Sequence, residues 1–186
     1  MRARLALIAT AACALIGAAE GAGAVSTNEL AGRLDAKALV LQPADVRGLL
    51  GGRFVYSGQI LYGMTTGYER NFVFRGGKDE LSIADGAWLF DSAGGAVNGF
   101  TTQKSVLLDL GLHRLRLTTR VGQQTCLYGK VRKGPNFHDA TYVMLWRHGR
   151  VVAQLSVLGT GSAGGPSVAL ALAQKQEARI AHALAG

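Results

Sequence analysis

Basic side chains dominate the second half of the sequence and supply its most evident chemistry. The interval from Lys104 to Arg150 contains nine Lys or Arg residues but only two acids, Asp109 and Asp139. A surface with such an excess of positive charge attracts anionic partners through long-range electrostatics. The interval also contains Cys126 and three of the four histidines, so nucleophilic and metal chemistry must be considered beside anion binding.

A Cys-His nucleophile pair would have to combine Cys126 with His138 and Asp139. The hairpin predicted for this region separates Cys126 from His138 by roughly seven residues along a strand, or about 23 Å at ~3.3 Å per residue. A nucleophile and its base must lie within hydrogen-bond reach, which this spacing forbids. His148 is nearer, but strand alternation directs it to the opposite side of the sheet. We therefore interpret Cys126 as a half-buried structural residue.

Metal and phosphate-loop motifs are not found in the sequence. The histidines are scattered at positions 113, 138, 148 and 182, so no pair of His or Cys residues has the short spacing of a metal site. The glycine-rich segments GLLGGRF and GTGSAGG lack the Lys-Ser/Thr pair of a phosphate-binding loop and a surrounding βαβ unit. We predict that the protein has no catalytic residue, no metal site and no cofactor.

Four strand-like segments must position the basic side chains. The segments HRLRLTTRV, QTCLYGKVR, TYVMLWRH and RVVAQLSVLG are rich in β-branched and aromatic residues, and short turn-forming segments separate them. The last turn is predicted at His148-Gly149. Because strands joined by short turns pair as an antiparallel meander, the interval from His113 to Gly159 is predicted to form four neighbouring strands.

The rest of the chain supplies further strands and the helices that cover the sheet. The spacing of apolar residues, and the Gly and Pro residues that end helices and strands, predict strands within 53–62, 70–75 and 81–90. They also predict a short helix from Pro43 and longer helices over 92–110 and 166–185. The second half has strands without intervening helices, and helices bracket that block. We therefore predict an α+β fold, in which an antiparallel sheet, the four-strand meander plus the N-terminal strands, is covered on one face by two helices.

Alternation along the predicted strands assigns side chains to the two faces of the sheet. One face, with Tyr142, Met144 and Trp146, is apolar and is predicted to be the core. The other face is cationic and is predicted to be open to a ligand. Its candidate ligand-binding residues are Arg114, Arg116, Arg120, Tyr128, Lys130, Arg132, Arg147 and Arg150. The same charges also suit a second interpretation, in which they serve only solubility and protection of the sheet edge.

The first 24 residues have the composition of a secretory signal peptide. Arg2 and Arg4 precede an apolar run from Leu5 to Ile16, and an A-x-A site predicts cleavage after Ala24. The apolar run is shorter than the roughly 20 residues that a membrane span needs. We therefore predict a secreted or periplasmic protein whose residues 25–186 form a single α+β domain without a membrane span.

Cys13 offers an alternative, because the three residues before it resemble a bacterial lipoprotein cleavage box. Only Leu5 to Ala9 would then remain as the apolar segment, against the roughly 7 to 15 residues that export requires. Soluble export is therefore favoured over a lipid anchor at Cys13. After cleavage Cys126 is the only cysteine, so no intramolecular disulfide can form.

Several segments together resemble a known class of domain. The segments LVLQPADVRG, GYERNF, DSAGGAVNGF, RVVAQLSVLG and ALAQKQEARI, with the meander between them, are similar to small exported or lipoprotein sensor-like domains of actinobacteria and their relatives. The extracellular sensor domain of mycobacterial serine/threonine kinases is the best-known relative. The resemblance implies an α+β sandwich with a groove for a ligand, and it carries over no catalytic residue. The kinase sensor domains are held by disulfides, which this chain cannot form.

These observations predict an exported, non-enzymatic binding protein for an anionic or amphipathic ligand of the cell envelope. The partner would be an anionic envelope polymer, a lipid headgroup or a small ligand. Nucleic acid is excluded as a partner because an exported protein meets little of it and the sequence has no recognised binding motif. Two alternatives stay open: a periplasmic carrier of a lipid or lipoprotein with an apolar cavity, and an uncharacterised hydrolase.

Overall fold

The computed structural model describes residues 34–50, 55–64, 67–76, 79–134, 137–160 and 164–185. The predicted signal peptide, the cleavage site at Ala24 and Cys13 lie outside the described residues. The fold is built on one antiparallel sheet of seven strands in the order β1-β2-β3-β7-β6-β5-β4. The strands are β1 (Val55–Met64), β2 (Gly67–Gly76), β3 (Asp79–Leu89), β4 (His113–Leu115), β5 (Gln124–Gly134), β6 (Phe137–His148) and β7 (Val151–Thr160).

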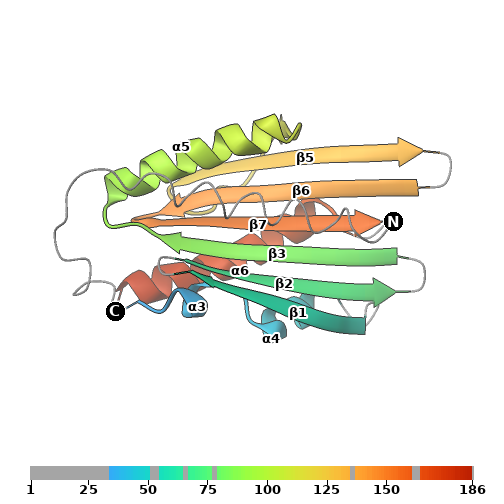
Figure 1. Ribbon diagram of the computed structural model, residues 1–186, viewed down its shortest axis with the longest axis horizontal. Coiled ribbons are helices and arrows are strands. Elements are labelled where there is room, and N and C mark those ends of the chain that lie inside the picture. Colours follow the sequence, from blue (N-terminus) through green and yellow to red (C-terminus); the bar gives the residue numbers. More distant parts are fainter. Residues whose placement is uncertain are drawn as a thin grey trace.

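The helices among the described residues pack on both faces of this sheet. They are α3 (Ala36–Leu39), α4 (Pro43–Leu50), α5 (Ala93–Asp109) and α6 (Pro166–Ala185). In Figure 1, α6 passes behind the strands with α3 and α4 near it, whereas α5 lies on the side of β5, β6 and β7. The α+β class and the antiparallel sheet are confirmed. The placement of the helices differs from the expectation, because the two long helices lie on opposite faces.

The α6 side of the sheet holds the larger apolar core. Side chains of β6 and β7 such as Met144, Trp146 and Leu155 are fully buried there against Leu172 and Ile180 of α6. Residues 39–41 and Val46 close the same core over β2 and β3. Burial of a large apolar side chain stabilises the fold by about 1.5 to 3 kcal/mol, so this core is the main source of stability.

The sequence led us to expect that the opposite face would be open. It is not, because α5 covers its centre. Ala96, Phe100 and Leu107 of α5 pack against strand residues on this face, namely Cys126, Tyr128, Val143, Leu145 and Val152. Every residue of β7 from Val151 to Gly159 is buried, as in a strand covered on both sides. The physical reason is that the middle of the predicted outer face is apolar, and such a surface is stabilised by a second layer.

The register of the last hairpin differs by two residues from the prediction. The two-residue turn lies at Gly149-Arg150, where Gly149 has φ 56°, and His148 pairs with Val151 across it. A left-handed φ is readily adopted by Gly, which places the turn here. Because the error in register is even, every side chain keeps its predicted face. The four neighbouring strands β4 to β7 are therefore confirmed, but the first strand, predicted over HRLRLTTRV, ends already at Leu115.

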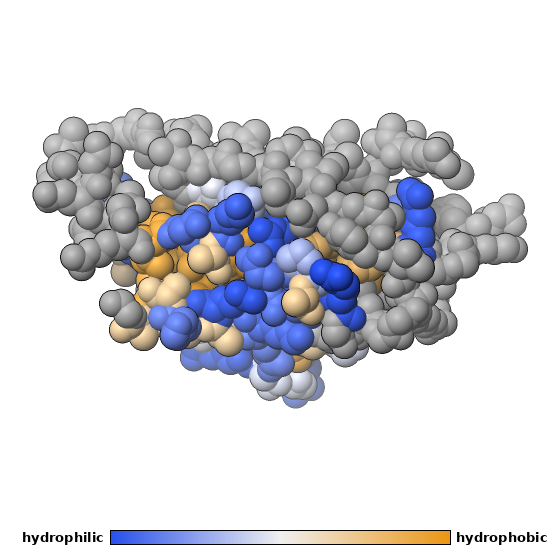
Figure 2. Space-filling view, turned by 90° about the horizontal axis from the view of Figure 1, so that it is seen from below, coloured by the Kyte–Doolittle hydropathy of each residue, from blue (hydrophilic) through white to orange (hydrophobic). Residues whose placement is uncertain are grey.

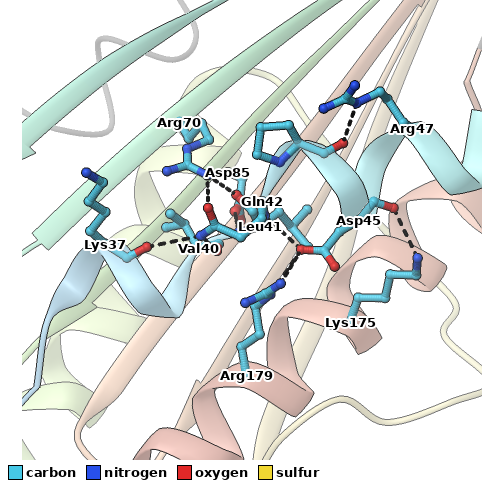
Figure 3. Close-up of polar contacts among 11 residues, drawn as sticks. Lys37, Val40, Leu41, Gln42, Asp45, Arg47, Arg70, Asp85, Lys175 and Arg179 are labelled. Atoms are coloured by element: carbon cyan, nitrogen blue, oxygen red, sulfur yellow. Dashed lines mark hydrogen bonds and ion pairs between the residues drawn. The ribbon is translucent and has the colours of Figure 1, made fainter.

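A buried polar clamp ties the segment before α4 to strands β2 and β3. The backbone N–H of Leu41 donates to Asp85 Oδ2 at 2.5 Å, and Arg70 Nη1 donates to the Leu41 carbonyl at 2.8 Å and to Gln42 Oε1 at 2.6 Å (Figure 3). Arg70 and Asp85 face each other across the β2–β3 ladder. Complete burial raises the pKa of Asp85 well above its usual value, although the Leu41 hydrogen bond and Arg70 act in the opposite direction.

Polar contacts also fix α6 to its neighbours. Asp45 of α4 accepts from Arg179 at 2.8 Å, and the Asp45 carbonyl accepts from Lys175 at 3.0 Å (Figure 3). On β6, Trp146 Nε1 and His148 Nδ1 both contact the Glu177 carboxylate, at 2.9 and 2.5 Å.

Seen from the side of α3 and α4, hydrophilic residues gather at the centre of the described surface with apolar patches beside them (Figure 2).

Candidate functional site: a cationic groove beside α5

A groove of about 660 Å³ runs between α5 and the edge of the sheet that carries β4. We call it the cationic groove. Its lining comes from α5, from β4 and the segment that follows it, and from the beginning of β5. The lining residues are Phe100, Lys104, Arg114, Leu115, Arg116, Leu117, Thr118, Thr119, Arg120, Gln123, Gln124, Thr125, Cys126 and Leu127. The volume is within the roughly 300 to 1,000 Å³ that small-molecule sites occupy.

The α5 wall of the groove is held by a cap, a close packing contact and a buried hydrogen bond. Ser92 caps the helix by accepting from the N–H of Gly95 at 3.0 Å. Gly99 lets the helix approach Phe90, because a Cβ at this position would lie 2.2 Å from the Phe90 ring. Gln103 Nε2 donates to Gln154 Oε1 of β7 at 2.8 Å in the buried interface. These contacts fix α5 on the sheet and so define one wall of the groove.

The opposite wall is the segment from Arg116 to Gln123, which is anchored at its C-terminal end. Val121 is buried, and its N–H donates to Thr125 Oγ1 at 3.0 Å. The N–H of Gln123 donates to the Arg147 carbonyl at 2.8 Å. Gly122 has φ 63°, and a Cβ there would lie 2.7 Å from the same carbonyl, so the turn requires glycine. The exposed residues before this anchor are thereby presented to the groove.

Four cations face the groove. Arg114, Arg116 and Arg120 are exposed, and within the described part of the chain none of their side chains makes a hydrogen bond or an ion pair. Lys104 Nζ lies 5.8 Å from the centroid of the Phe100 ring, at cation–π distance. The lining residues include no Asp or Glu. The groove is therefore a cationic site whose charges are not neutralised by the described residues around it.

The neutral lining residues complement these charges. Three threonine hydroxyls and two glutamine amides line the groove and can donate or accept hydrogen bonds, and they belong to Thr118, Thr119, Thr125, Gln123 and Gln124. Phe100 and three leucines give it an apolar part. The site can therefore hold an anionic group by charge, orient it by hydrogen bonds, and contact an adjoining apolar moiety.

The other predicted site residues lie outside this groove, and two of them, Lys130 and Arg147, make hydrogen bonds within the fold. Lys130 Nζ donates to the Leu110 carbonyl at the end of α5 at 3.3 Å. Arg147 donates to Gln124 Oε1 at 3.0 Å and to the Gly149 carbonyl at 2.7 Å. Arg132 is exposed near the end of β5 opposite Asp139, and Arg150 lies half-buried in the β6–β7 turn. The eight predicted residues therefore do not form one surface.

Tyr128 was predicted on an exposed face, and the structure corrects this. Its side chain is 1% exposed because α5 lies over it. Burial, and the neighbouring Cys126, raise the pKa of Tyr128 to about 12. Tyr128 therefore belongs to the core beneath α5, and its hydroxyl stays protonated at neutral pH.

The nucleophile and base candidates do not come together. Cys126 is opposite Leu145 and His138 is opposite Lys133, so the two lie seven positions apart along the β5–β6 ladder. This is about 23 Å at ~3.3 Å per residue. His148 points to the α6 side and contacts Glu177. Among the described residues, no group of three or more His, Cys, Asp or Glu side chains could hold a metal ion.

Lys104 and Phe100 are site residues that strand alternation alone did not identify. Both come from α5, whose place on the cationic side of the sheet was not predicted. The sequence feature that could have predicted this position of α5 is the apolar character of Val143, Leu145 and Val152 on the cationic side of the sheet. Burial of these side chains requires a covering layer.

Comparison with known proteins gives no family for this chain. No protein-family model and no curated protein matches it. The extracellular domain of PknH from Mycobacterium tuberculosis resembles it weakly in structure, with 9% identity and a TM-score of 0.48, covering 81% of this chain and 98% of that domain. A protein of Bacteroides thetaiotaomicron VPI-5482 is 10% identical with a TM-score of 0.31, covering 65% of this chain and 46% of that one. Among the described helices, none has the length and apolarity that crossing a bilayer requires.

Proposed function

We propose that the protein is an exported, non-enzymatic binding protein whose cationic groove holds an anionic or amphipathic ligand of the cell envelope. The observation that carries the proposal is the set of guanidinium groups of Arg114, Arg116 and Arg120. They line one groove with Lys104, no acid lines it, and the described residues offer the arginines no internal partner. Arginines that served the fold would have such partners, as Arg147 and Arg179 do.

The donor types favour a phosphate or carboxylate group on the ligand. A guanidinium group presents a planar fork that matches these anions and forms charge-assisted hydrogen bonds of roughly 2.7 to 2.9 Å. The groove is open to solvent on the side of the exposed arginines, so binding depends on screened charge and weakens as salt rises. The apolar part beside Phe100 accommodates an amphipathic ligand.

The two alternative functions have less support. A carrier would need apolar space between helices and sheet, but on the α6 side this region is filled by fully buried side chains such as Leu39, Trp146 and Leu172. A hydrolase would need a nucleophile beside a base, and Cys126 and His138 are too far apart for this. Binding without covalent chemistry is therefore the function that the groove favours.

The proposal is tested with a soluble polyphosphate probe. We expect inositol hexakisphosphate to bind the mature protein in isothermal titration calorimetry, with an affinity that falls as sodium chloride is added. The double substitution Arg114→Glu with Arg116→Glu should weaken binding at least about tenfold, since each reversed charge changes an attraction into a repulsion.

A charge-matched control separates the groove from net charge alone. The double substitution Lys37→Glu with Arg47→Glu makes the same change in net charge on α3 and α4, on the opposite face of the sheet. It should reduce the affinity by less than about threefold, because these side chains lie beyond screened electrostatic reach of the groove. Equal losses in the two double variants, or no binding at low salt, would contradict the proposed function.

Export and processing are part of the same proposal. The signal-like composition of residues 1–24 supports cleavage after Ala24, with residues 25–186 as a single mature domain. Protein recovered from the extracytoplasmic fraction of its host should begin at Val25. A protein that stays in the cytoplasm with its N-terminus intact would contradict export but would leave the groove test unaffected.

A further inference from the structure

The flank of α5 beside the cationic groove carries a stripe of four side chains that includes two exposed aliphatic residues. Val97, Thr101, Lys104 and Leu108 follow one another at intervals of four, three and four residues, which places them on one helix face. Val97 is 37% exposed and Leu108 is 52% exposed, although both are large apolar residues. Lys104, between them, lines the groove. The helix that forms the groove wall therefore also presents two aliphatic side chains to solvent.

This combination is the surface chemistry that docks on an anionic bilayer. Such surfaces place aliphatic side chains at the boundary between headgroups and acyl chains, and basic side chains among the anionic headgroups. From Val97 to Leu108 the helix advances about 16 Å at ~1.5 Å per residue, so both side chains can reach one membrane surface. Lys104 between them can extend its amine towards the headgroups while its stem lies along the apolar surface.

The groove beside the stripe suits the phosphate of a lipid headgroup. Its volume of about 660 Å³ admits a headgroup. Arg114 and Arg116 supply forked donors for phosphate oxygens, and the lining hydroxyls of Thr118 and Thr119 suit a polyol such as glycerol. A ligand held by its phosphate in the groove would have its apolar tail next to the α5 stripe.

We propose that the protein docks on a bilayer containing anionic phospholipid through the groove-side flank of α5, with a lipid phosphate entering the cationic groove. This inference rests on the proposed function of the groove as an anion site, and it adds the source of the anion, a lipid in a membrane. The charge complementarity of the four groove cations with anionic headgroups selects this occupant over a neutral apolar partner.

Vesicle sedimentation tests the docking. The mature protein should sediment with vesicles of equal parts phosphatidylglycerol and phosphatidylcholine and stay in solution with vesicles of phosphatidylcholine alone. The double substitution Val97→Ser with Leu108→Ser should weaken vesicle binding about tenfold, since it removes two aliphatic groups from the contact. The same variant should bind soluble inositol hexakisphosphate as the unmodified protein does, because the groove cations are unchanged.

A matched variant controls for the general effect of removing exposed aliphatic groups. Val131 is 48% exposed but lies on β5 at a position that alternates to the α6 side with Leu127. Val131→Ser should therefore leave vesicle binding within about twofold of that of the unmodified protein. Circular dichroism of each variant must match the unmodified protein, so that unfolding does not account for a loss of binding.

The outcomes distinguish this inference from the proposed function on which it rests. Binding of the soluble probe without sedimentation on phosphatidylglycerol vesicles would overturn the membrane docking and leave the anion site standing. Equal sedimentation of the unmodified protein and the Val97/Leu108 double variant would also overturn it. Loss of vesicle binding in the Arg114/Arg116 double variant, together with loss in the Val97/Leu108 double variant, would support the complete arrangement.

Discussion

The two faces of the sheet use charged residues in different ways. On the α6 side, Asp45 pairs with Arg179, Glu177 contacts Trp146 and His148, and Asp85 accepts from the Leu41 backbone. On the α5 side, the groove arginines have no such partner among the described residues. The paired charges on the α6 side therefore serve the fold, whereas the groove arginines on the α5 side are available for binding.

The same contrast appears in the apolar layers. The α6 side joins α3, α4 and α6 to β2, β3, β6 and β7 in one core, while the opposite side has a smaller core beneath α5. A helix covers only part of a seven-stranded sheet, so α5 leaves the edge at β4 uncovered and creates the groove there. Incomplete covering of a sheet by a helix can therefore produce a binding site at the sheet edge.

The largest effect is expected from removing the buried clamp on the α6 side. Asp85→Ala leaves the Leu41 N–H without an acceptor and removes the carboxylate that faces Arg70. Loss of such a buried partner costs about 3 kcal/mol of unfolding free energy. Urea unfolding measures this value, and a change below about 0.5 kcal/mol, the size of a surface substitution, would contradict the clamp's structural role.

On the α5 side, packing at Gly99 should have the next largest effect. Gly99→Val places side-chain atoms against the Phe90 ring, where a Cβ alone would lie at 2.2 Å. Overpacking of this kind costs about 1 to 3 kcal/mol and should move α5 away from the sheet. Gly94→Val is the matched control in the same helix, because the nearest atom to its Cβ is 3.8 Å away. Equal unfolding free energies for the two variants would contradict the close contact.

The pH dependence of stability provides a finer test of the α6 side. Burial raises the folded-state pKa of Asp85, so its favourable contribution is complete below the unfolded pKa, about 3.9, and is lost as pH rises through the folded pKa. Relative to Asp85→Asn, which does not titrate, the unmodified protein should lose stability as the pH rises above about 4, the usual pKa of Asp. A constant difference between the two proteins over this range would contradict the raised pKa.

Much of the fold followed from the sequence, because strand alternation and turn residues are local signals. The segment TYVMLWRH predicted β6, and alternation placed Met144 and Trp146 in the core correctly although the register differed by two residues. The position of α5 could not be predicted in this way. Its residues show an apolar helix face, but which side of the sheet that face contacts depends on the path of the chain between Leu89 and His113.

The candidate site was predicted in part for the same reason. Arg114, Arg116 and Arg120 were identified because they are basic residues in and just after the first strand of the meander, and they do line the groove. Tyr128 was wrongly placed on an exposed surface because the covering helix was not foreseen. Lys104 and Phe100 contribute to the groove because α5 packs near the sheet edge. The spacing of residues within one helix or strand does not predict such packing between distant segments.

The smallest effect on stability is expected where the charges have no internal role. Replacing Arg114, Arg116 and Arg120 together by Ala should change the unfolding free energy by about 0.5 kcal/mol or less, as for surface sites without partners. Arg147→Ala, which removes hydrogen bonds to Gln124 and the Gly149 carbonyl, should cost about 1 kcal/mol. The two variants should show the opposite order in probe binding, because only the triple variant empties the groove of guanidinium groups. A triple variant less stable than Arg147→Ala would mean that the groove arginines serve the fold, and the contrast between the two faces would no longer hold.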